Sequence, residues 1–419
     1  MNKKKYLFFS WLLTILITII WTYENPEKIE YIKDKAKLYK PEHKFEDLKK
    51  IKNSDIFNSN HFTLKLEKII SLEDKTSFVV NNSNNKDFNI NEVEIFTQEG
   101  FSLKKDNVKK LKINKNFTKD FNGGLKNVFY INEDIYGLAS SKNKNCYYAA
   151  IVNLSDGHEL LKSQCLTLDG GTTIDFNGLG SSSIHYNDKI LISIGTPTTN
   201  SISINNLAQD KDSYFGKILY INIEDFKKQK IELKNFSIGH RNPQGITQIK
   251  NKIFSVEHGP QGGDELNKIT LGSNYGWPKV SYGTKYSYDD GGKSYPLGHE
   301  ENGFKEPLFA FVPSIGISAL NTCPSKLKNY YKKNCLIGLS LYGNNLRPGK
   351  SLLIFLLDEK LEKIHSIEKV YLDRPLRHFM TNRKNEIFED SNGNIYLSSD
   401  FNGIYRLNFD NFRNWFYIL

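Results

Sequence analysis

The sequence predicts an all-β fold, a six-bladed β-propeller, with a signal anchor or signal peptide at its amino terminus. Three observations indicate this: an apolar run follows a group of lysines at the start of the chain, a strand-and-turn pattern occurs six times, and aromatic residues make up 13% of the chain. Aromatic side chains suit the pleated, half-buried surface of a sheet. One propeller can hold most of the 419 residues, because all-β units often exceed the average domain length.

The amino terminus has the pattern of an export signal. Lys3, Lys4 and Lys5 precede an uncharged apolar run at residues 6–21. Positive charge before an apolar segment directs the rest of a chain out of the cytoplasm. We therefore expect residues 1–22 to form a signal anchor or a cleaved signal peptide. The protein would then be periplasmic or otherwise extracytoplasmic, held to the inner membrane by residues 6–21. Residues 23–60 are charged and contain proline, and we expect a partly helical linker there.

Four cysteines form two local pairs, which agrees with export. Cys146 and Cys165 flank two expected strands that meet at a turn at residues 156–157, and Cys323 and Cys335 are close in sequence. Thiols on paired strands lie within reach of each other, and disulfides persist in oxidising compartments. We expect two disulfides; free buried thiols are the alternative.

A short apolar strand that runs into Ser, Gly or Asp occurs six times, at intervals of 55 to 83 residues. The copies read TSFVVNN, DIYGLASS, KILISIGT, KIFSVEHG, NCLIGLSLYG and NIYLSSD. Near-regular units of several short strands are typical of propeller blades. We assign residues 61–412 to the propeller, with a surface insertion at residues 284–304.

The repeated strands are expected to be the innermost strands of the blades, and segments such as residues 217–225 and 351–358 to be outer strands. The copies end at Thr196, Gly259, Tyr342 and Asp400. Because inner strands surround the propeller axis, these ends would meet at one central site.

The net charge of +10 raises the question of a nucleic-acid partner. The lysines are scattered through polar turns, for example at residues 104–119, and no basic helix or aromatic stacking platform accompanies them. We expect a solvated basic surface and no nucleic-acid partner.

Residues 239–283 have the densest polar and special-geometry sequence in the chain. They contain GHRNPQG, a short strand, EHGPQGGDE and NYGWP in that order. Glycine and proline set the backbone geometry with which polar groups can converge on a ligand. For Asp264 and Glu265, a cation site and simple loop hydrogen bonds remain equal alternatives.

This block resembles the glucose/sorbosone dehydrogenase family, soluble aldose dehydrogenases that use pyrroloquinoline quinone (PQQ) and calcium on a six-bladed propeller. The resemblance is strongest in residues 239–283 and extends more weakly over residues 60–410. It implies that Arg241 and Asn242 contact PQQ and that the carbonyls of Gly259 and Pro260 bind calcium.

Two further positions follow from the same resemblance. Ser314 falls where the family has a small hydroxyl residue near the cofactor, and Arg377 matches the second arginine of an Arg-x-Arg clamp. PQQ is a planar ortho-quinone with several carboxylates, so cationic partners and a hard cation suit it.

The chain departs from the family pattern at the general base. The family histidine falls near Asn177 or Gly178, in the segment DFNGLGSSSIHYNDKILISIGT, and neither residue can accept a proton. The catalytic base is therefore unknown, with Asp175 and His185 as candidates to replace it.

The cofactor clamp departs as well. Tyr342 stands where the family has a cofactor lysine. The first clamp arginine aligns with Pro375, and Arg374 is adjacent to it.

Two functions follow from this resemblance and its departures. The first is a PQQ- and calcium-dependent dehydrogenase that transfers hydride from a sugar hydroxyl carbon to the quinone, with a sugar or aldehyde substrate and an electron acceptor that the sequence does not identify. The alternative is a non-catalytic calcium-binding propeller that binds a glycan or protein partner.

Overall fold

The computed structural model describes residues 41–413, apart from residues 52–53, 84–85, 168–173, 198–200, 229–230, 232–233, 287–291 and 343–348. No helix within these residues is long and apolar enough to cross a membrane. The expected signal segment, residues 1–22, lies outside them.

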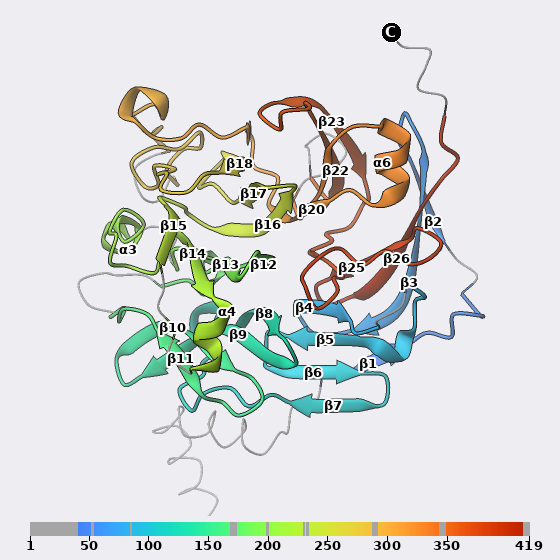
Figure 1. Cartoon of the computed structure of the whole chain (residues 1–419), viewed down its shortest axis with the longest axis horizontal. Coiled ribbons are helices and arrows are strands. Elements are labelled where there is room, and N and C mark those ends of the chain that lie inside the picture. The colour runs from blue at the N-terminus through green and yellow to red at the C-terminus, as the bar shows by residue number, and fades with distance from the viewer. Residues whose placement is uncertain are drawn as a thin grey trace, which may run out of the picture. The chain divides into compact units, whose positions relative to one another are not determined.

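Six antiparallel sheets surround a central axis and form the blades of a propeller (Figure 1), which confirms the predicted all-β class and blade number. Blade 1 contains β4 (Thr76–Asn81), β5 (Val93–Thr97), β6 (Phe101–Lys104) and β7 (Asn107–Lys110). Blade 2 contains β8 (Leu125–Ile131), β9 (Asp134–Asn143), β10 (Cys146–Asn153) and β11 (Glu159–Lys162). Blade 3 contains β12 (Ser183–Tyr186), β13 (Lys189–Ile194), β14 (Lys217–Asn222) and β15 (Lys234–Ile238).

The second half of the chain repeats this arrangement. Blade 4 contains β16 (Pro243–Ile249), β17 (Lys252–Glu257), β18 (Asp264–Ile269) and β19 (Phe309–Phe311). Blade 5 contains β20 (Ile317–Thr322), β21 (Cys335–Ser340), β22 (Ser351–Leu357) and β23 (Ile364–Tyr371). Short helices occupy loops at α3 (Ile202–Asn206), α4 (Ile223–Lys227), α6 (Ser325–Tyr331), η1 (Ile90–Glu92), η2 (Asp120–Asn122), η3 (Phe176–Gly178) and η4 (Glu300–Asn302).

Blade 6 is built from both ends of the propeller sequence. Its strands are β24 (His378–Phe379), β25 (Ile395–Ser399) and β26 (Gly403–Asp410) from the end and β3 (Thr63–Leu72) from the beginning, and β26 pairs with β3. The strands β1 (His43–Phe45) and β2 (Asp55–Asn58) also pair with β3. The described part of the expected helical linker therefore contains strands instead.

The first strand of each blade is the innermost one. Around the axis β4 contacts β8, β12 contacts β16, β16 contacts β20, β20 contacts β24, and β24 contacts β4. Five copies of the repeated pattern lie in second strands instead, so the prediction that they ring the axis was wrong for β9, β13, β17, β21 and β25. A second strand has a blade neighbour on both edges and is buried on both faces, which makes it the most continuously apolar; all six residues of β21 are buried. The first copy lies in the inner strand β4, one strand out of phase with the others.

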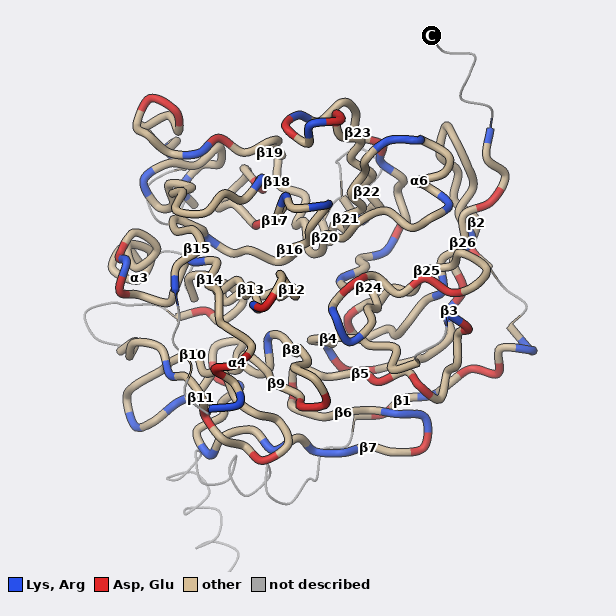
Figure 2. The backbone as a smooth tube through the Cα atoms, viewed as in Figure 1, with Lys and Arg blue, Asp and Glu red and all other residues tan. Residues whose placement is uncertain are grey.

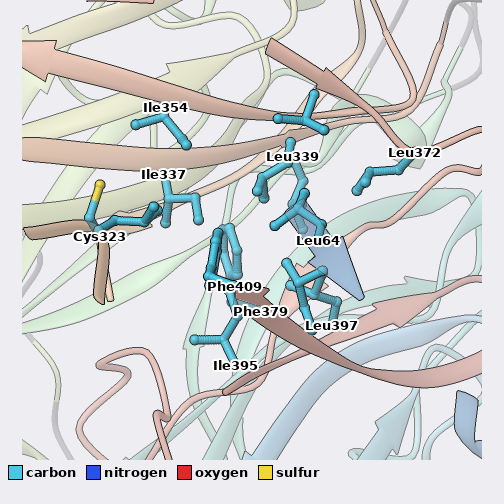
Figure 3. Close-up of a cluster of buried hydrophobic side chains, with 14 of the residues drawn as sticks. Leu64, Cys323, Ile337, Leu339, Ile354, Leu372, Phe379, Ile395, Leu397 and Phe409 are labelled. Carbon is cyan, nitrogen blue, oxygen red and sulfur yellow. The ribbon is translucent and has the colours of Figure 1, made fainter. Parts of the chain in front are cut away.

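Apolar side chains fill the space between adjacent blades. Figure 3 shows the cluster between blades 5 and 6, where Ile337 and Leu339 of β21 lie near Leu397 of β25 and Leu64 of β3. Leu64 comes from the start of the propeller sequence and packs against strands from its end, so this core holds the ring closed.

Both predicted disulfides are present. Cys146, at the start of β10, bonds to Cys165 beyond β11, and Cys323 bonds to Cys335 at the start of β21. The two Cα–Cα distances are 5.2 and 5.5 Å, within the usual range for disulfides. Basic and acidic residues are interspersed over the loops and outer strands of the blades (Figure 2).

A fully buried lysine holds the loop that joins β13 to β14. The Nζ atom of Lys217 donates hydrogen bonds to the carbonyls of Leu207 at 2.7 Å, Ala208 at 3.0 Å and Phe215 at 2.8 Å. Three N–H groups thus meet three acceptors, which offsets part of the cost of burial; burial still lowers the pKa of Lys217 to about 7.

Replacing Lys217 with Met is expected to lower the free energy of unfolding by about 2 kcal/mol, because three buried carbonyls lose their hydrogen bonds while the cost of burying the amine is relieved. Urea unfolding measures the change. Lys227→Met, which removes an exposed ion pair with Glu224, is the control and should leave the midpoint unchanged. If the Lys217→Met protein is as stable as the wild type, the cost of burying the lysine amine cancels the stabilisation from its three hydrogen bonds.

Candidate functional site

A cavity of about 260 Å³ opens at the end of the axis where the inner strands begin. We call this end the mouth. Every blade contributes to the cavity, and its lining includes Lys75, Lys126, Asn177, Asn242, Tyr342 and Arg377, from blades 1 to 6 in that order. The mouth is therefore assembled from the residues at or just before the inner strands and just after some second strands.

Arg241 lies beside the mouth and is engaged by its surroundings. Its backbone N–H donates to Oε2 of Glu257 at 2.7 Å, and its Nη1 donates to the carbonyls of Gly259 at 2.6 Å and His258 at 3.1 Å. The guanidinium also stacks on Trp277, 5.2 Å from the ring centroid. The Nε atom is buried without a hydrogen-bond partner among the described residues, so at least this donor of the guanidinium is not used by the protein.

Asn242 joins the mouth segments of blades 3 and 4. Its Oδ1 accepts hydrogen bonds from the Gly180 N–H at 2.9 Å and from Nε2 of Gln244 at 2.7 Å, and its Nδ2 donates to the Asn177 carbonyl at 3.2 Å. Gly180 allows this approach because a Cβ there would lie 2.2 Å from Oδ1 of Asn242. Asn242 thus positions the segment in which the histidine was expected.

The two carbonyls that were expected to bind calcium lie in one turn after β17. The Gly259 carbonyl accepts the short hydrogen bond from Arg241, and Pro260 lines a small cavity beside it. Among the described residues there is no group of three or more His, Cys, Asp or Glu side chains that could hold a metal ion. A carbonyl oxygen has two lone pairs, so the bond to Arg241 leaves one of them on Gly259.

Asp264 connects this turn to the start of blade 5. Its Oδ1 accepts from the Gly259 N–H at 3.0 Å and from the Ser314 hydroxyl at 2.8 Å. Its Oδ2 accepts from the backbone N–H groups of Ile315, Gly316 and Ile317 at 3.0, 2.6 and 3.2 Å. Five donors saturate this buried carboxylate, so Asp264 serves the loops, and Ser314 is held beside the turn as one of its partners.

The remaining predicted cofactor residues separate into two groups. Arg377 lines the cavity and forms an ion pair with Asp400, and Tyr342 lines it with its ring against Gly316 and 65% of its surface exposed. Arg374 does not line the cavity: it forms ion pairs with Asp373 and, at 2.8 Å, with Asp55 of β2.

Neither candidate base lines the cavity. Asp175 caps η3, accepting from the Asn177 N–H at 2.9 Å, and also accepts from Nδ2 of Asn122 at 3.1 Å. His185 lies on β12 with Nε2 3.0 Å from the Tyr130 carbonyl, and burial lowers its pKa.

Three titratable residues that line the cavity were missed in the sequence. Burial, followed by the charge of Arg377, lowers the pKa of Lys75, and burial together with Lys75 lowers the pKa of Lys126 to about 7. Burial and Arg377 lower the pKa of His378 to about 3. All three lie at or next to the beginning of an inner strand, whereas the sequence pattern placed the site at the ends of the repeated strands.

Comparison with known proteins identifies related sequences. The family described as Glucose / Sorbosone dehydrogenase matches residues 105–406. Quinoprotein glucose dehydrogenase B of Acinetobacter calcoaceticus is 36% identical over 107 residues, which cover 24% of this chain and 21% of that protein. Aldose sugar dehydrogenase YliI of Escherichia coli (strain K12) is 34% identical over 125 residues, 27% of this chain and 33% of that protein. The alignments to such relatives span at most about half of the relatives' own length.

Solved structures share the fold. The PQQ-bound form of an aldose sugar dehydrogenase from Streptomyces coelicolor superposes with a TM-score of 0.53 at 15% identity, covering 85% of this chain and 98% of that one. At this identity the likeness concerns the propeller alone.

Proposed function

The chain belongs to the glucose/sorbosone dehydrogenase family, and we propose that it is a PQQ-dependent dehydrogenase that oxidises a sugar or related aldehyde. One observation carries the proposal: Lys75, Lys126 and Arg377 reach one cavity from three blades, and none of the described residues that line it is acidic. A basic cavity without carboxylates suits a ligand with several negative charges. PQQ has this chemistry, and when bound it would accept the hydride of the substrate.

Aromatic side chains around the mouth favour a sugar as the second ligand. Phe121 and Phe401 lie in the loops next to the cavity segments of blades 2 and 6, are 41% and 67% exposed, and have positive φ angles of 52° and 56°. A bulky residue in this conformation is strained, and exposed aromatic surface favours binding. The apolar face of a sugar ring could pack on these side chains while its hydroxyl groups reach the polar cavity.

Calcium dependence is part of the proposal. The carbonyls of Gly259 and Pro260 would supply two oxygen ligands, and the cofactor and water would supply the others. Arg241 donates to the Gly259 carbonyl, so the ion would compete with that hydrogen bond or share the oxygen with it. Removing calcium with a chelator should then abolish sugar oxidation, and adding calcium back should restore it.

We also propose that the protein works outside the cytoplasm, attached to the membrane by residues 6–21. The two disulfides support an oxidising compartment. Recovery of the full chain in the soluble cytoplasmic fraction would contradict this location.

Reconstitution tests the function. Purified protein with PQQ and calcium should reduce a redox dye when an aldose is added, and titration calorimetry should detect PQQ binding. If no PQQ binds with calcium present, the quinone proposal is wrong and the non-catalytic propeller becomes the better explanation.

Arg377→Met should weaken PQQ binding by about tenfold or more, because a charged hydrogen bond to a carboxylate contributes about 1.5–3 kcal/mol. Arg374→Met is the matched control: this neighbouring arginine pairs with Asp55 and does not line the cavity, so PQQ affinity should stay within about twofold. Equal losses in the two variants would contradict the placement of the cofactor against Arg377.

A further inference from the structure

The cavity contains a candidate for the missing base that the family pattern does not assign. The basic side chains among its described lining residues are Lys75, Lys126, His258, Arg377 and His378. Arg377 stays protonated at any working pH. A base for a sugar hydroxyl needs a free lone pair and a pKa close to the working pH.

The two histidines do not meet these conditions. Burial and the charge of Arg377 lower the pKa of His378 to about 3, which leaves its imidazole a very weak base. His258 is half-buried, and its Nδ1 accepts from Nδ2 of Asn242 at 3.5 Å, which places the ring proton on Nε2 and leaves the imidazole no free lone pair. Neither histidine therefore meets both conditions for the base.

Lys126 has a defined position at the cavity. It is the second residue of β8, and its Nζ donates to the Asn122 carbonyl at 2.6 Å. The Nδ2 atom of Asn122 in turn donates to Asp175, which caps the turn that carries Asn177. Asn122 thus connects the Lys126 amine to the segment in which the family histidine was expected.

The charges around Lys126 explain why its amine can lose its proton near neutral pH. Lys126 is half-buried, and the loss of water around its amine disfavours the ammonium; the positive charges of Lys75 and Arg377 disfavour it further, while Asp175 and Asp400 act in the opposite direction. The net result is a pKa of about 7. A lysine with lowered pKa among other cations is a known type of catalytic base.

We propose that the Lys126 amine is the catalytic base of this site. The inference rests on the proposed function. A bound ortho-quinone would accept the hydride that leaves the carbinol carbon of the sugar, a two-electron reduction of the cofactor. The hydroxyl proton passes to Nζ of Lys126, giving an ammonium, and the carbon–oxygen bond becomes a carbonyl. The ammonium then returns its proton to water.

The Lys126→Arg variant tests whether Lys126 acts as a base or only binds the cofactor through its positive charge. Arginine keeps the positive charge but cannot be deprotonated, so kcat should fall by at least about 100-fold while the dissociation constant of PQQ changes by less than about threefold. If Lys126 instead holds a PQQ carboxylate, the arginine variant should remain active and Lys126→Met should lose PQQ affinity; that outcome would overturn the assignment. In the wild-type enzyme kcat should fall as pH is lowered through the pKa of Lys126 in the PQQ complex, because the neutral amine is the active form; the carboxylates of bound PQQ would raise this pKa above its value in the protein alone.

Competitive acetylation of the protein without cofactor, followed by peptide mass spectrometry, gives a readout that needs no turnover. The reactivity of Lys126 should be half-maximal near pH 7, and in Lys75→Met the midpoint should rise because one repelling charge is gone. An ordinary lysine midpoint, near 10.4, would overturn the inference. A wild-type enzyme that oxidises sugar and an arginine variant that does so equally well would refute the base alone, whereas a wild-type protein that oxidises no sugar would refute both the proposed function and the base.

Discussion

Asp264→Asn is expected to lower the free energy of unfolding by about 3 kcal/mol and to abolish PQQ binding. The carboxylate of Asp264 accepts five hydrogen bonds, three of them from consecutive backbone N–H groups. An amide offers one oxygen, and its NH₂ group would face donors that need an acceptor, so buried N–H groups would be left without partners at about 1–3 kcal/mol each. The turn of Gly259 and the Ser314 segment would then lose their common anchor.

Denaturant unfolding and calorimetry with PQQ measure the two effects. Asp358→Asn is the matched control, because Asp358 also accepts backbone hydrogen bonds, from Glu362 and Lys363, but lies in an exposed loop. This control should leave both the unfolding midpoint and PQQ affinity unchanged. A stable Asp264→Asn protein that binds PQQ normally would show that these loops do not depend on the carboxylate.

Gly403→Ala is expected to cost at least about 3 kcal/mol, because it combines a strained backbone with a clash in the strand pair that closes the ring. Gly403 begins β26 with a φ of 133°, and a Cβ there would lie 1.8 Å from the carbonyl oxygen of Ile70 in β3. Backbone cannot move aside as a flexible side chain can, so the pairing of β26 with β3 would have to shift. Limited proteolysis should then cleave the region before β4 faster than in the wild type.

Gly272→Ala isolates the backbone contribution. Gly272 has a φ of 78°, and a Cβ added there would have no atom within 4 Å, so only the conformational strain of about 1 kcal/mol is expected. If the two alanine variants lose equal stability, the approach of Ile70 to Gly403 has no energetic importance.

The repeats made the blade number predictable, because second strands such as β21 are buried on both faces and read as continuous apolar runs. Inner strands such as β16 lack such a run. In β16, Gln244, Thr247 and Gln248 are interspersed with apolar residues, because this strand faces both a neighbouring strand and the axis. The loss of a histidine near Asn177 was visible in the sequence. The place of Lys126 in the cavity was not, because it depends on a connection to Asn122 and on charges from blades far away in sequence.

The residues that line the cavity and the residues that pack the blades together occupy different positions, and this affects how such a protein can diverge. Residues such as Lys75, Lys126 and Arg377 stand at or just before the inner strands, whereas the packing that holds the blades together lies within the strands and between the sheets. A substitution at one of these positions changes a side chain that lines the cavity and leaves the packing between the blades almost unchanged. During evolution, a family member can therefore lose one proton acceptor and gain another from a different blade while every sheet stays folded. The replacement of a catalytic residue need not pass through an unstable protein.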